Sequence, residues 1–172
     1  MTSRTIVRVR GFLLLLAAAA CTGHNGGGTG PKTAPQVSAG SDTTLPAGSV
    51  YTLSATFTDL PPGQHAFHVH AVGRCEPPFE SAGIHFNPTQ RHHGRDNPQG
   101  SHAGDMPNIE VTDRKAAKIE IILRDVSLMS GPNRLLDSDG ASLVVHERAD
   151  DYVSDPAGNA GARIACGVIA AR

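Results

Sequence analysis

Aromatic side chains are scarce in this sequence, at 4% of 172 residues, and tryptophan is absent. Glycine (19 residues) and proline (12 residues) are frequent by contrast. Such a composition favours short strands joined by many turns and leaves little room for helix. One hydrophobic core is enough for a chain of this length. We therefore expect a single all-β domain.

The sequence also lacks an excess of charge of either sign. Its formal net charge is -1 at pH 7, and no run of Lys and Arg is interleaved with aromatic residues. Proteins that bind nucleic acid usually carry such a basic patch, because the phosphate backbone must be neutralised. We expect no nucleic-acid partner.

The longest apolar run, residues 11–20, is too short for a comfortable membrane span. Arg4, Arg8 and Arg10 precede it, and a charged stretch followed by a short apolar stretch is typical of a secretory signal, here residues 1–20. The run ends at Cys21 after small residues, as in the cleavage site of bacterial lipoproteins, although Ala18 stands where Leu is more usual. Cys21 is then either acylated, which would anchor the chain to a membrane surface, or a spare thiol after ordinary cleavage.

The next segment, residues 21–49, is rich in Gly and Pro and has little apolar surface to bury. We interpret it as a flexible tether between the membrane surface and the folded domain, residues 50–172. His24 lies in this tether. A solvated histidine is the simpler reading, and weak copper binding is the alternative.

Apolar and polar residues alternate over residues 51–58, which predicts a strand with one face against a core. The Leu-Pro-Pro-Gly sequence at 60–63 breaks this run, so we expect residues 65–72 to return as the partner in a hairpin. Further strands are predicted at 108–112, 116–123, 142–146 and 163–169, which indicates an antiparallel sandwich or barrel. Two long irregular stretches, 71–107 and 147–162, lie between them, and long loops in a small β domain are usually functional.

Histidine is over-represented, with seven of the nine residues between His65 and His102. His68 and His70 are two apart on a predicted strand, so both project from one face. An all-imidazole set suits copper, and three imidazoles with one carboxylate suit tetrahedral zinc. Seven residues can form the eight bonds of such a pair of sites if one imidazole serves both ions. The candidates are His68, His70, His85, His93, His102, Asp105 and His146.

Six segments, spread over residues 51–169, resemble the signature segments of copper/zinc superoxide dismutases, particularly the bacterial ones. The resemblance implies an antiparallel Greek-key β-sandwich or barrel of the immunoglobulin-like type with long metal-binding loops. It also implies an oxidoreductase that defends against extracytoplasmic superoxide in the bacterial cell envelope, in the periplasm or as an anchored lipoprotein. The segments are Phe67-His-Val-His70, Ser81-Ala-Gly-Ile-His-Phe-Asn-Pro88, His93-Gly94, His102-Ala-Gly-Asp105, Val145-His-Glu-Arg-Ala-Asp-Asp151 and Gly158-Asn-Ala-Gly-Ala-Arg-Ile-Ala-Cys-Gly-Val-Ile169.

The resemblance assigns a role to each candidate ligand. His85 would bridge the two ions and carry a proton during catalysis. His65 and His92 match no ligand, and we expect His65 to bond to loop backbone and His92 to be exposed. The implied copper ligands are His68, His70, His85 and His146, and the implied zinc ligands are His85, His93, His102 and Asp105.

Four further residues gain a role from the same resemblance. Asp150 would link a copper-ligand histidine to a zinc-ligand histidine, as a carboxylate that orients metal ligands. Cys75 and Cys166 would form a disulfide between the ligand-bearing loop and the last strand. Arg163 would attract and position superoxide beside copper, since a guanidinium keeps its charge at any working pH.

The sequence departs from the family at its beginning. Members usually have two more strands ahead of residue 50, whereas residues 31–49 hold only Val37 and Leu45 as sizeable apolar residues. The first hairpin is therefore short or missing, which leaves a sheet edge exposed or covered by a partner, such as a second copy in a homodimer. Ala157 also replaces a hydroxyl residue that often narrows the substrate channel.

Two other functional classes compete with the enzyme. A non-catalytic module that buffers copper or zinc in the envelope would be favoured by loss of a copper ligand or of Arg163, and neither is lost. An inert β-domain used for adhesion would require the His and Asp set to be accidental. Superoxide dismutase is the preferred interpretation.

Overall fold

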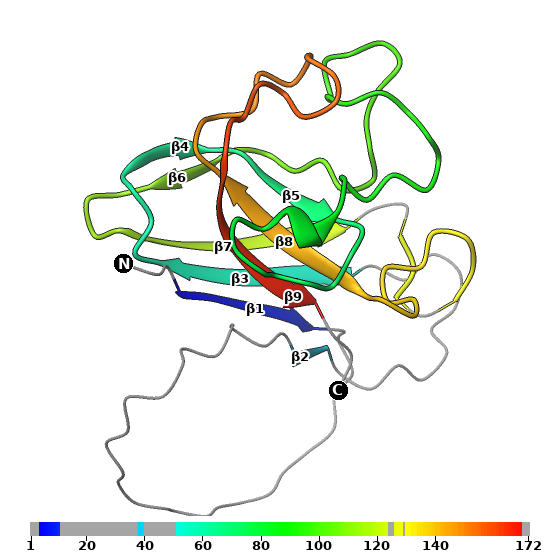
Figure 1. Ribbon diagram of the computed structural model, residues 1–172, viewed down its shortest axis with the longest axis horizontal. Coiled ribbons are helices and arrows are strands. Elements are labelled where there is room, and N and C mark those ends of the chain that lie inside the picture. Colours follow the sequence, from blue (N-terminus) through cyan, green and yellow to red (C-terminus); the bar gives the residue numbers. More distant parts are fainter. Residues whose placement is uncertain (1–3, 11–37, 40–50, 124–125, 129, 170–172) are drawn as a thin grey trace, which may run out of the picture.

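Strands make up nearly all the regular structure of the computed structural model, which describes residues 4–10, 38–39, 51–123, 126–128 and 130–169 (Figure 1). Within these ranges, the helical structure is one turn of 3-10 helix, η1 (Glu80–Ala82), and no helix is long and apolar enough to cross a membrane. Cys21 and His24 lie outside the described residues. The strands are β1 (Arg4–Arg10), β2 (Ser38–Ala39), β3 (Tyr51–Thr58), β4 (Gly63–His65), β5 (Phe67–His70), β6 (Ile109–Val111), β7 (Ala116–Leu123), β8 (Ala141–His146) and β9 (Arg163–Ile169).

The strands form two layers around one core. One layer has the order β2-β1-β3-β7, in which β3 pairs with both neighbours in antiparallel register. The other consists of the pair β4-β6 and the sheet β5-β8-β9, and only Ala66 separates β4 from β5. This arrangement confirms the predicted all-β antiparallel fold class.

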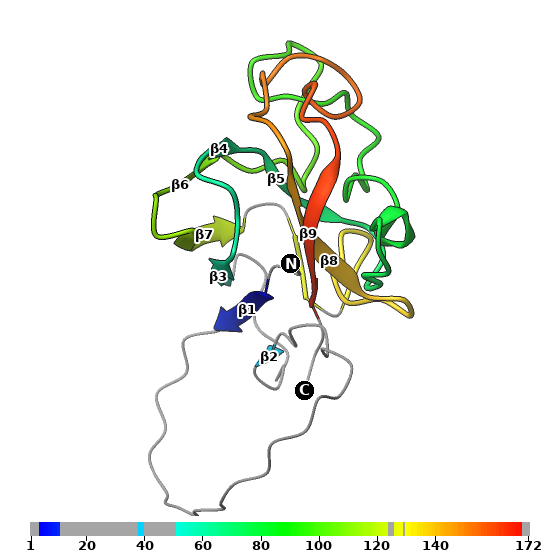
Figure 2. The same ribbon diagram turned by 60° about the vertical axis from the view of Figure 1, so that its left-hand side comes forward.

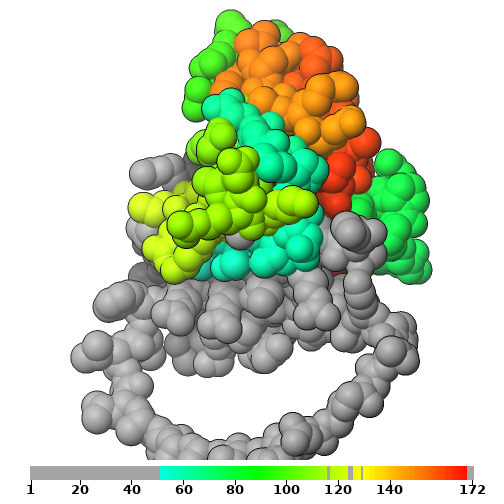
Figure 3. All heavy atoms as spheres, turned by 90° about the vertical axis from the view of Figure 1, so that its left-hand side faces the viewer, coloured from blue at the N-terminus to red at the C-terminus, as the bar shows by residue number. Residues whose placement is uncertain are grey.

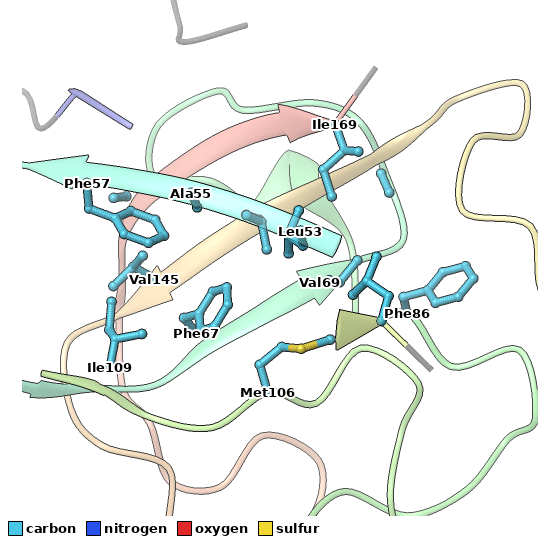
Figure 4. Packing of buried hydrophobic residues seen from close by; sticks show 14 of the residues in the cluster. Leu53, Ala55, Phe57, Phe67, Val69, Phe86, Met106, Ile109, Val145 and Ile169 are labelled. Carbon is cyan, nitrogen blue, oxygen red and sulfur yellow. The ribbon is translucent and has the colours of Figure 1, made fainter. Parts of the chain in front are cut away.

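Alternation in β3 places every second side chain in the core. Tyr51, Leu53, Ala55 and Phe57 are buried, whereas the residues between them are partly exposed. Figure 4 shows Leu53, Ala55 and Phe57 facing side chains from the strands of the other layer. The rings of Phe57 and Phe67 meet edge to face at 6.0 Å between centroids. The predicted strand at 51–58 is therefore confirmed, with its apolar face inward.

The predicted hairpin between residues 51–58 and 65–72 is wrong. β3 pairs with β1 and β7, whereas β4 pairs with β6 and β5 pairs with β8. β3 already has a partner strand on each side, and all four residues of β5 are buried in the second layer. The Pro-Pro sequence at 61–62 supplies no backbone N–H donors and carries the chain from one layer to the other.

Side chains of β5 serve two different environments. Phe67 and Val69 belong to the hydrophobic core, and His68 and His70 are fully buried outside it. This division follows from the two-residue period of a strand. It places both histidines toward the two long loops.

Part of the loop 71–107 lies beside the loop 147–162 at one end of the molecule, in green and orange in Figures 1 and 2, whereas η1 of the first loop lies lower, beside β8. The space-filling view in Figure 3 shows the same two colours side by side at the upper end. A disulfide between Cys75 and Cys166, 91 residues apart in sequence, ties the first loop to β9. Closing a loop of this length stabilises the fold by about 4.5 kcal/mol in the chain-entropy model.

The edge of β3 is covered by β1. The two strands pair in antiparallel register from Arg4 opposite Thr58 to Arg10 opposite Thr52. The sequence predicts these same residues to be the charged part of an export signal. If residues 1–20 are cleaved off as a signal, residues 4–10 cannot also form the edge strand β1. Whether β3 is paired on this side therefore shows whether residues 4–10 are still present.

We predict that β3 loses protection from hydrogen exchange in a chain that begins at Cys21. Without β1, the N–H groups of β3 on that side have no strand partner, and their exchange should accelerate about ten-fold or more, as for other freely opening edges. Hydrogen-exchange mass spectrometry of both chains measures this difference. β8, which keeps β5 and β9 on its two sides, is the internal control. Equal protection of β3 in both chains would contradict the prediction.

Candidate metal centre

Four imidazoles converge between β5, β8 and the loop 71–107. His68 and His70 come from β5, and His146 ends β8. His85 reaches them from the loop, where its backbone pairs with that of His70. One ring nitrogen from each residue lies within 4.8 Å of the others. The fold therefore brings together the four residues that the resemblance assigns to copper.

Backbone carbonyls fix the tautomers of two of these rings. Nδ1–H of His70 donates to Gly83 O at 2.9 Å, and Nδ1–H of His146 donates to Gly161 O at 3.2 Å. A carbonyl oxygen can only accept, so the proton of each neutral ring is on Nδ1 and the lone pair is on Nε2. Both lone pairs are thus available to a metal ion.

The free nitrogens of this group are buried and have no hydrogen-bond partner among the described residues. Leaving one buried polar atom unpaired costs about 1–3 kcal/mol, so four in one place require an explanation. An ion bound by all four supplies it, and four imidazole nitrogens with no thiolate suit copper. The four atoms are His68 Nδ1, His70 Nε2, His85 Nε2 and His146 Nε2.

Burial keeps three of these rings neutral. It lowers the pKa of His70 to about 2, of His146 to about 3 and of His85 to about 4, and repulsion from neighbouring imidazoles adds to the effect. These rings are therefore unprotonated at neutral pH. That is the protonation state in which an imidazole can ligate a metal.

A second group gathers around one oxygen of Asp105. Asp105 Oδ1 lies 2.9 Å from His93 Nδ1, 3.1 Å from His85 Nδ1 and 3.2 Å from His102 Nδ1. His102 Nδ1 and His85 Nδ1 are 3.3 Å apart. Ligands at about 2.0 Å from a tetrahedral zinc ion are about 3.3 Å from one another, which matches these separations. The donor set of three imidazoles and one carboxylate also fits zinc.

The carboxylate of Asp105 is held in position by the backbone. Its Oδ2 accepts the N–H groups of Gly94 and His102, both at 3.0 Å, which leaves Oδ1 toward the three rings. Burial opposes its charge, but hydrogen bonds with His102, His85 and His93 hold its pKa well below the usual range. Asp105 is therefore a permanently charged partner for a cation.

One ring belongs to both groups. His85 presents Nε2 to the first group and Nδ1 to the second. His68 also lies within 4.8 Å of the second group, but its Nε2 is engaged by Asp150 and its free Nδ1 belongs to the first group. The geometry thus supports His102, rather than His68, as the fourth member of the second group.

Asp150 links the two groups from behind. Its Oδ2 accepts Nε2–H of His68 at 2.8 Å, and its Oδ1 accepts Nε2–H of His93 at 3.0 Å. Burial opposes the charge of Asp150, but hydrogen bonds from His68 and His93 keep its pKa below the usual range. The pKa of His93 is raised to about 9 despite burial, because Asp105 and Asp150 both stabilise its charged form. This carboxylate orients one ring of each group.

Arg163 stands beside the first group. It is opposite His146 in the register of β8 and β9, and its charge contributes to the lowered pKa of His70 and His146. Its Nη1–H donates to Phe79 O at 2.7 Å, and Nη2 is 3.6 Å from Glu80 Oε2. Its side chain is 17% exposed, so a cationic group lies at the rim of the site.

The two remaining histidines of the cluster lie outside both groups, as predicted. His65 contacts Pro61 O and His146 O through its two ring nitrogens. The side chain of His92 is 52% exposed and lies 3.6 Å from Asp155.

Sequence reasoning missed Asp155 and Gly158. Asp155 Oδ1 accepts the N–H of His93 at 2.5 Å, which ties the loop 147–162 to a residue of the second group. Gly158 lies so close to Asp150 that a Cβ at this position would be 1.9 Å from its Oδ1. The acidic residue and the glycine are visible in the sequence, but no spacing rule connects Asp155 to His93, 62 positions away, or Gly158 to the carboxylate of Asp150.

Comparison with known proteins adds independent support. The family described as "Copper/zinc superoxide dismutase (SODC)" matches residues 38–169. Superoxide dismutases [Cu-Zn] 1 and 2 of Aquifex aeolicus are 50% and 52% identical over 115 and 113 residues, which are 65% and 64% of this chain. The match covers 68% and 66% of these relatives, so about a third of each lies outside it.

A solved structure shares the fold. The crystal structure of a superoxide dismutase-like protein from Bacillus subtilis matches with a TM-score of 0.67 and 42% identity, over 69% of this chain and 81% of that chain. The profile match, the relatives and the paired metal groups agree with one another. The chain therefore belongs to the copper/zinc superoxide dismutase family.

Proposed function

We propose that this family member converts superoxide to molecular oxygen and hydrogen peroxide at a copper ion beside a zinc ion. The observation that carries the proposal is the set of four buried, unpartnered nitrogens. One of their rings, that of His85, also belongs to the second group around Asp105, which we call the zinc group. Copper supplies one-electron exchange when bound, and zinc supplies fixed positive charge. The proposed ligands are His68, His70, His85 and His146 for copper, and His85, His93, His102 and Asp105 for zinc.

His85 has the position to handle a proton. Its Nδ1 faces the zinc group, so Nε2 is the atom of this ring that can accept a proton and give it to the product. Burial lowers its pKa to about 4, so the ring is neutral at pH 7 and Nε2 keeps a free lone pair. Peroxide formation needs protons, and this ring can deliver one without moving away from the site.

Arg163 is the proposed binding group for the substrate anion. A guanidinium beside His70 and His146 attracts a small anion toward the space that their Nε2 atoms face. A module that only buffers metal gains nothing from a cation at this place, because the cation disfavours metal binding. The position of Arg163 therefore supports catalysis over buffering.

Metal analysis combined with a superoxide-decay assay tests the proposed function. We expect the purified chain to bind about one copper and one zinc, because its two groups offer the donor atoms that each metal prefers. We also expect it to accelerate superoxide decay. Decay that remains at the rate of the uncatalysed reaction, with both metals bound, would favour the buffering module instead.

Reversing the charge at position 163 should slow the reaction and leave metal content intact. We expect Arg163→Glu to lower the second-order rate constant by about ten-fold or more, because local steering changes from attraction to repulsion. Stopped-flow measurement at low ionic strength gives this rate. Arg148→Glu is the matched control, since Arg148 is 63% exposed and bonds to Asn159 O. Equal rates for wild type and Arg163→Glu would remove Arg163 from the mechanism.

We also propose that the chain is exported to the bacterial cell envelope, in the periplasm or as a lipoprotein acylated at Cys21. The charged and apolar residues 1–20 support export, and so does the disulfide, because such bonds persist in oxidising compartments. Export with cleavage removes β1 and opens the edge of β3, where a homodimer would form. The mass of the protein extracted from envelopes, with its sedimentation, tests cleavage, acylation and dimerisation together.

A further inference from the structure

Tyr152 adopts a backbone conformation that is uncommon for its residue type. Its φ is 64°, in the left-handed region that non-glycine residues rarely occupy. A conformation of this kind is strained and persists only where surrounding contacts impose it. Tyr152 lies in the loop 147–162, two residues after Asp150.

Three contacts with distant residues impose this conformation. The guanidinium of Arg95 lies 3.7 Å above the centre of the Tyr152 ring. The hydroxyl oxygen accepts the N–H of Asn108 at 2.8 Å, and the carbonyl oxygen accepts the N–H of Asp96 at 3.1 Å. Tyr152 therefore joins the loop 147–162 to the loop 71–107 and to Asn108, the residue before β6.

The N–H of Tyr152 acts directly on the carboxylate that links the two metal groups. It donates to Asp150 Oδ1 at 2.7 Å, the same oxygen that accepts Nε2–H of His93. A hydrogen bond from a backbone N–H favours the charged carboxylate and restricts its rotation. The orientation of His93 thus depends on the direction of the N–H of residue 152.

Asn108 closes the arrangement around Asp150. Its side-chain amide donates to Asp150 O at 2.9 Å and accepts the N–H of Asp150 at 2.8 Å. The backbone N–H of the same asparagine donates to the Tyr152 hydroxyl. The ring of Tyr152 and the backbone of Asp150 are therefore held by one residue.

We propose that Tyr152 is a positioning residue, which directs its N–H at Asp150 and thereby sets the zinc affinity of the pocket formed by His85, His93, His102 and Asp105. The proposal rests on the proposed function of that pocket. Without the ring and hydroxyl contacts, residue 152 relaxes to negative φ and its N–H turns away from Asp150. The carboxylate then rotates, and His93 loses the partner that fixes its ring.

The test is the zinc affinity of Tyr152→Leu in the full chain, measured with zinc alone by competition against a chromophoric chelator. Loss of an orienting partner typically weakens metal binding by about 10–100-fold, and for this more distant residue we expect the lower end. Tyr152→Phe retains the ring over which Arg95 lies and should recover most of the affinity. A second readout is the ring N–H signal of His93 by NMR, which should exchange with water faster in Tyr152→Leu.

Tyr51→Leu is the matched control, because Tyr51 is a buried tyrosine of the β3 core rather than of the site. Zinc affinity of Tyr152→Leu within two-fold of wild type, or an equal loss in Tyr51→Leu, would overturn the proposal. If Tyr152→Leu does not fold, Arg95→Ala decides: weaker zinc binding at unchanged thermal midpoint supports the proposal, and unchanged binding contradicts it. A wild-type chain that binds no zinc would instead end the proposed function.

Discussion

Replacing His85 with glutamine should nearly abolish catalysis and weaken both metal groups at once. The ring offers Nδ1 to the zinc group, 3.1 Å from Asp105 Oδ1, and leaves Nε2 as an unpartnered atom of the copper group. A glutamine side chain cannot present two basic nitrogens on opposite sides, so it cannot serve both groups as we propose that His85 does. The loss of a positioned proton donor alone costs about 10²–10⁴-fold in rate.

Metal content and superoxide decay per bound copper measure the effect of His85→Gln. We expect a rate at least about a thousand-fold below wild type, within the range for lost proton transfer and lost ligand geometry together. His92→Gln is the control, because His92 is adjacent to a zinc-group residue in sequence but exposed in the structure. Substantial activity in His85→Gln, at full metal content, would show that the bridging ring is dispensable.

Much of the fold follows from the two-residue period of the sequence. The predicted strands 116–123 and 163–169 coincide with β7 and β9, and the apolar face of β3 lies in the core. The partner of each strand did not follow from periodicity. Alternation identifies a strand and its inner face, but the layer to which it belongs depends on connections such as the Pro-Pro crossing at 61–62.

The start of the domain shows the same limit. Residues 4–10 read as the charged part of an export signal, yet they form a strand that pairs with β3. The charge and length of residues 1–20 favour the export signal. The edge that β3 would otherwise leave open favours the strand. Neither property excludes the other in the sequence, so only the pairing reveals the conflict.

At the candidate metal centre, the residues that converge could be predicted from the sequence, whereas the backbone groups that fix two of their rings could not. Histidine is rare enough that a cluster with this spacing indicates metal chemistry. The tautomers of His70 and His146 instead depend on the carbonyls of Gly83 and Gly161. Every residue has a carbonyl, so no side-chain pattern marks these two positions.

A methyl group at position 158 should disrupt the link between the two metal groups. Gly158 has φ of +62°, and a Cβ there would lie 1.9 Å from Asp150 Oδ1 and 2.8 Å from His93 Nε2. Neither neighbour can easily withdraw, because both are buried and Asn108 holds the backbone of Asp150. We expect Gly158→Ala to weaken zinc binding by about 100-fold, at the upper end for lost orienting partners.

Gly131→Ala separates collision from backbone strain. Gly131 also has positive φ, at +83°, but the nearest atom to an added Cβ is 3.9 Å away. This control should lose stability on the order of 1 kcal/mol and retain its zinc affinity. An equal loss of zinc in both variants would assign the effect to strain.

A double-mutant cycle identifies the group that the methyl displaces. In an Asp150→Ala background, the oxygen nearest to the new Cβ is gone, so Gly158→Ala should cause little further loss of zinc affinity. Residues that act through one contact show such non-additivity, whereas independent effects add. Full additivity of the two substitutions would mean that Gly158 acts on His93 directly, and that the carboxylate between the two rings is not the means by which this loop controls the metal centre.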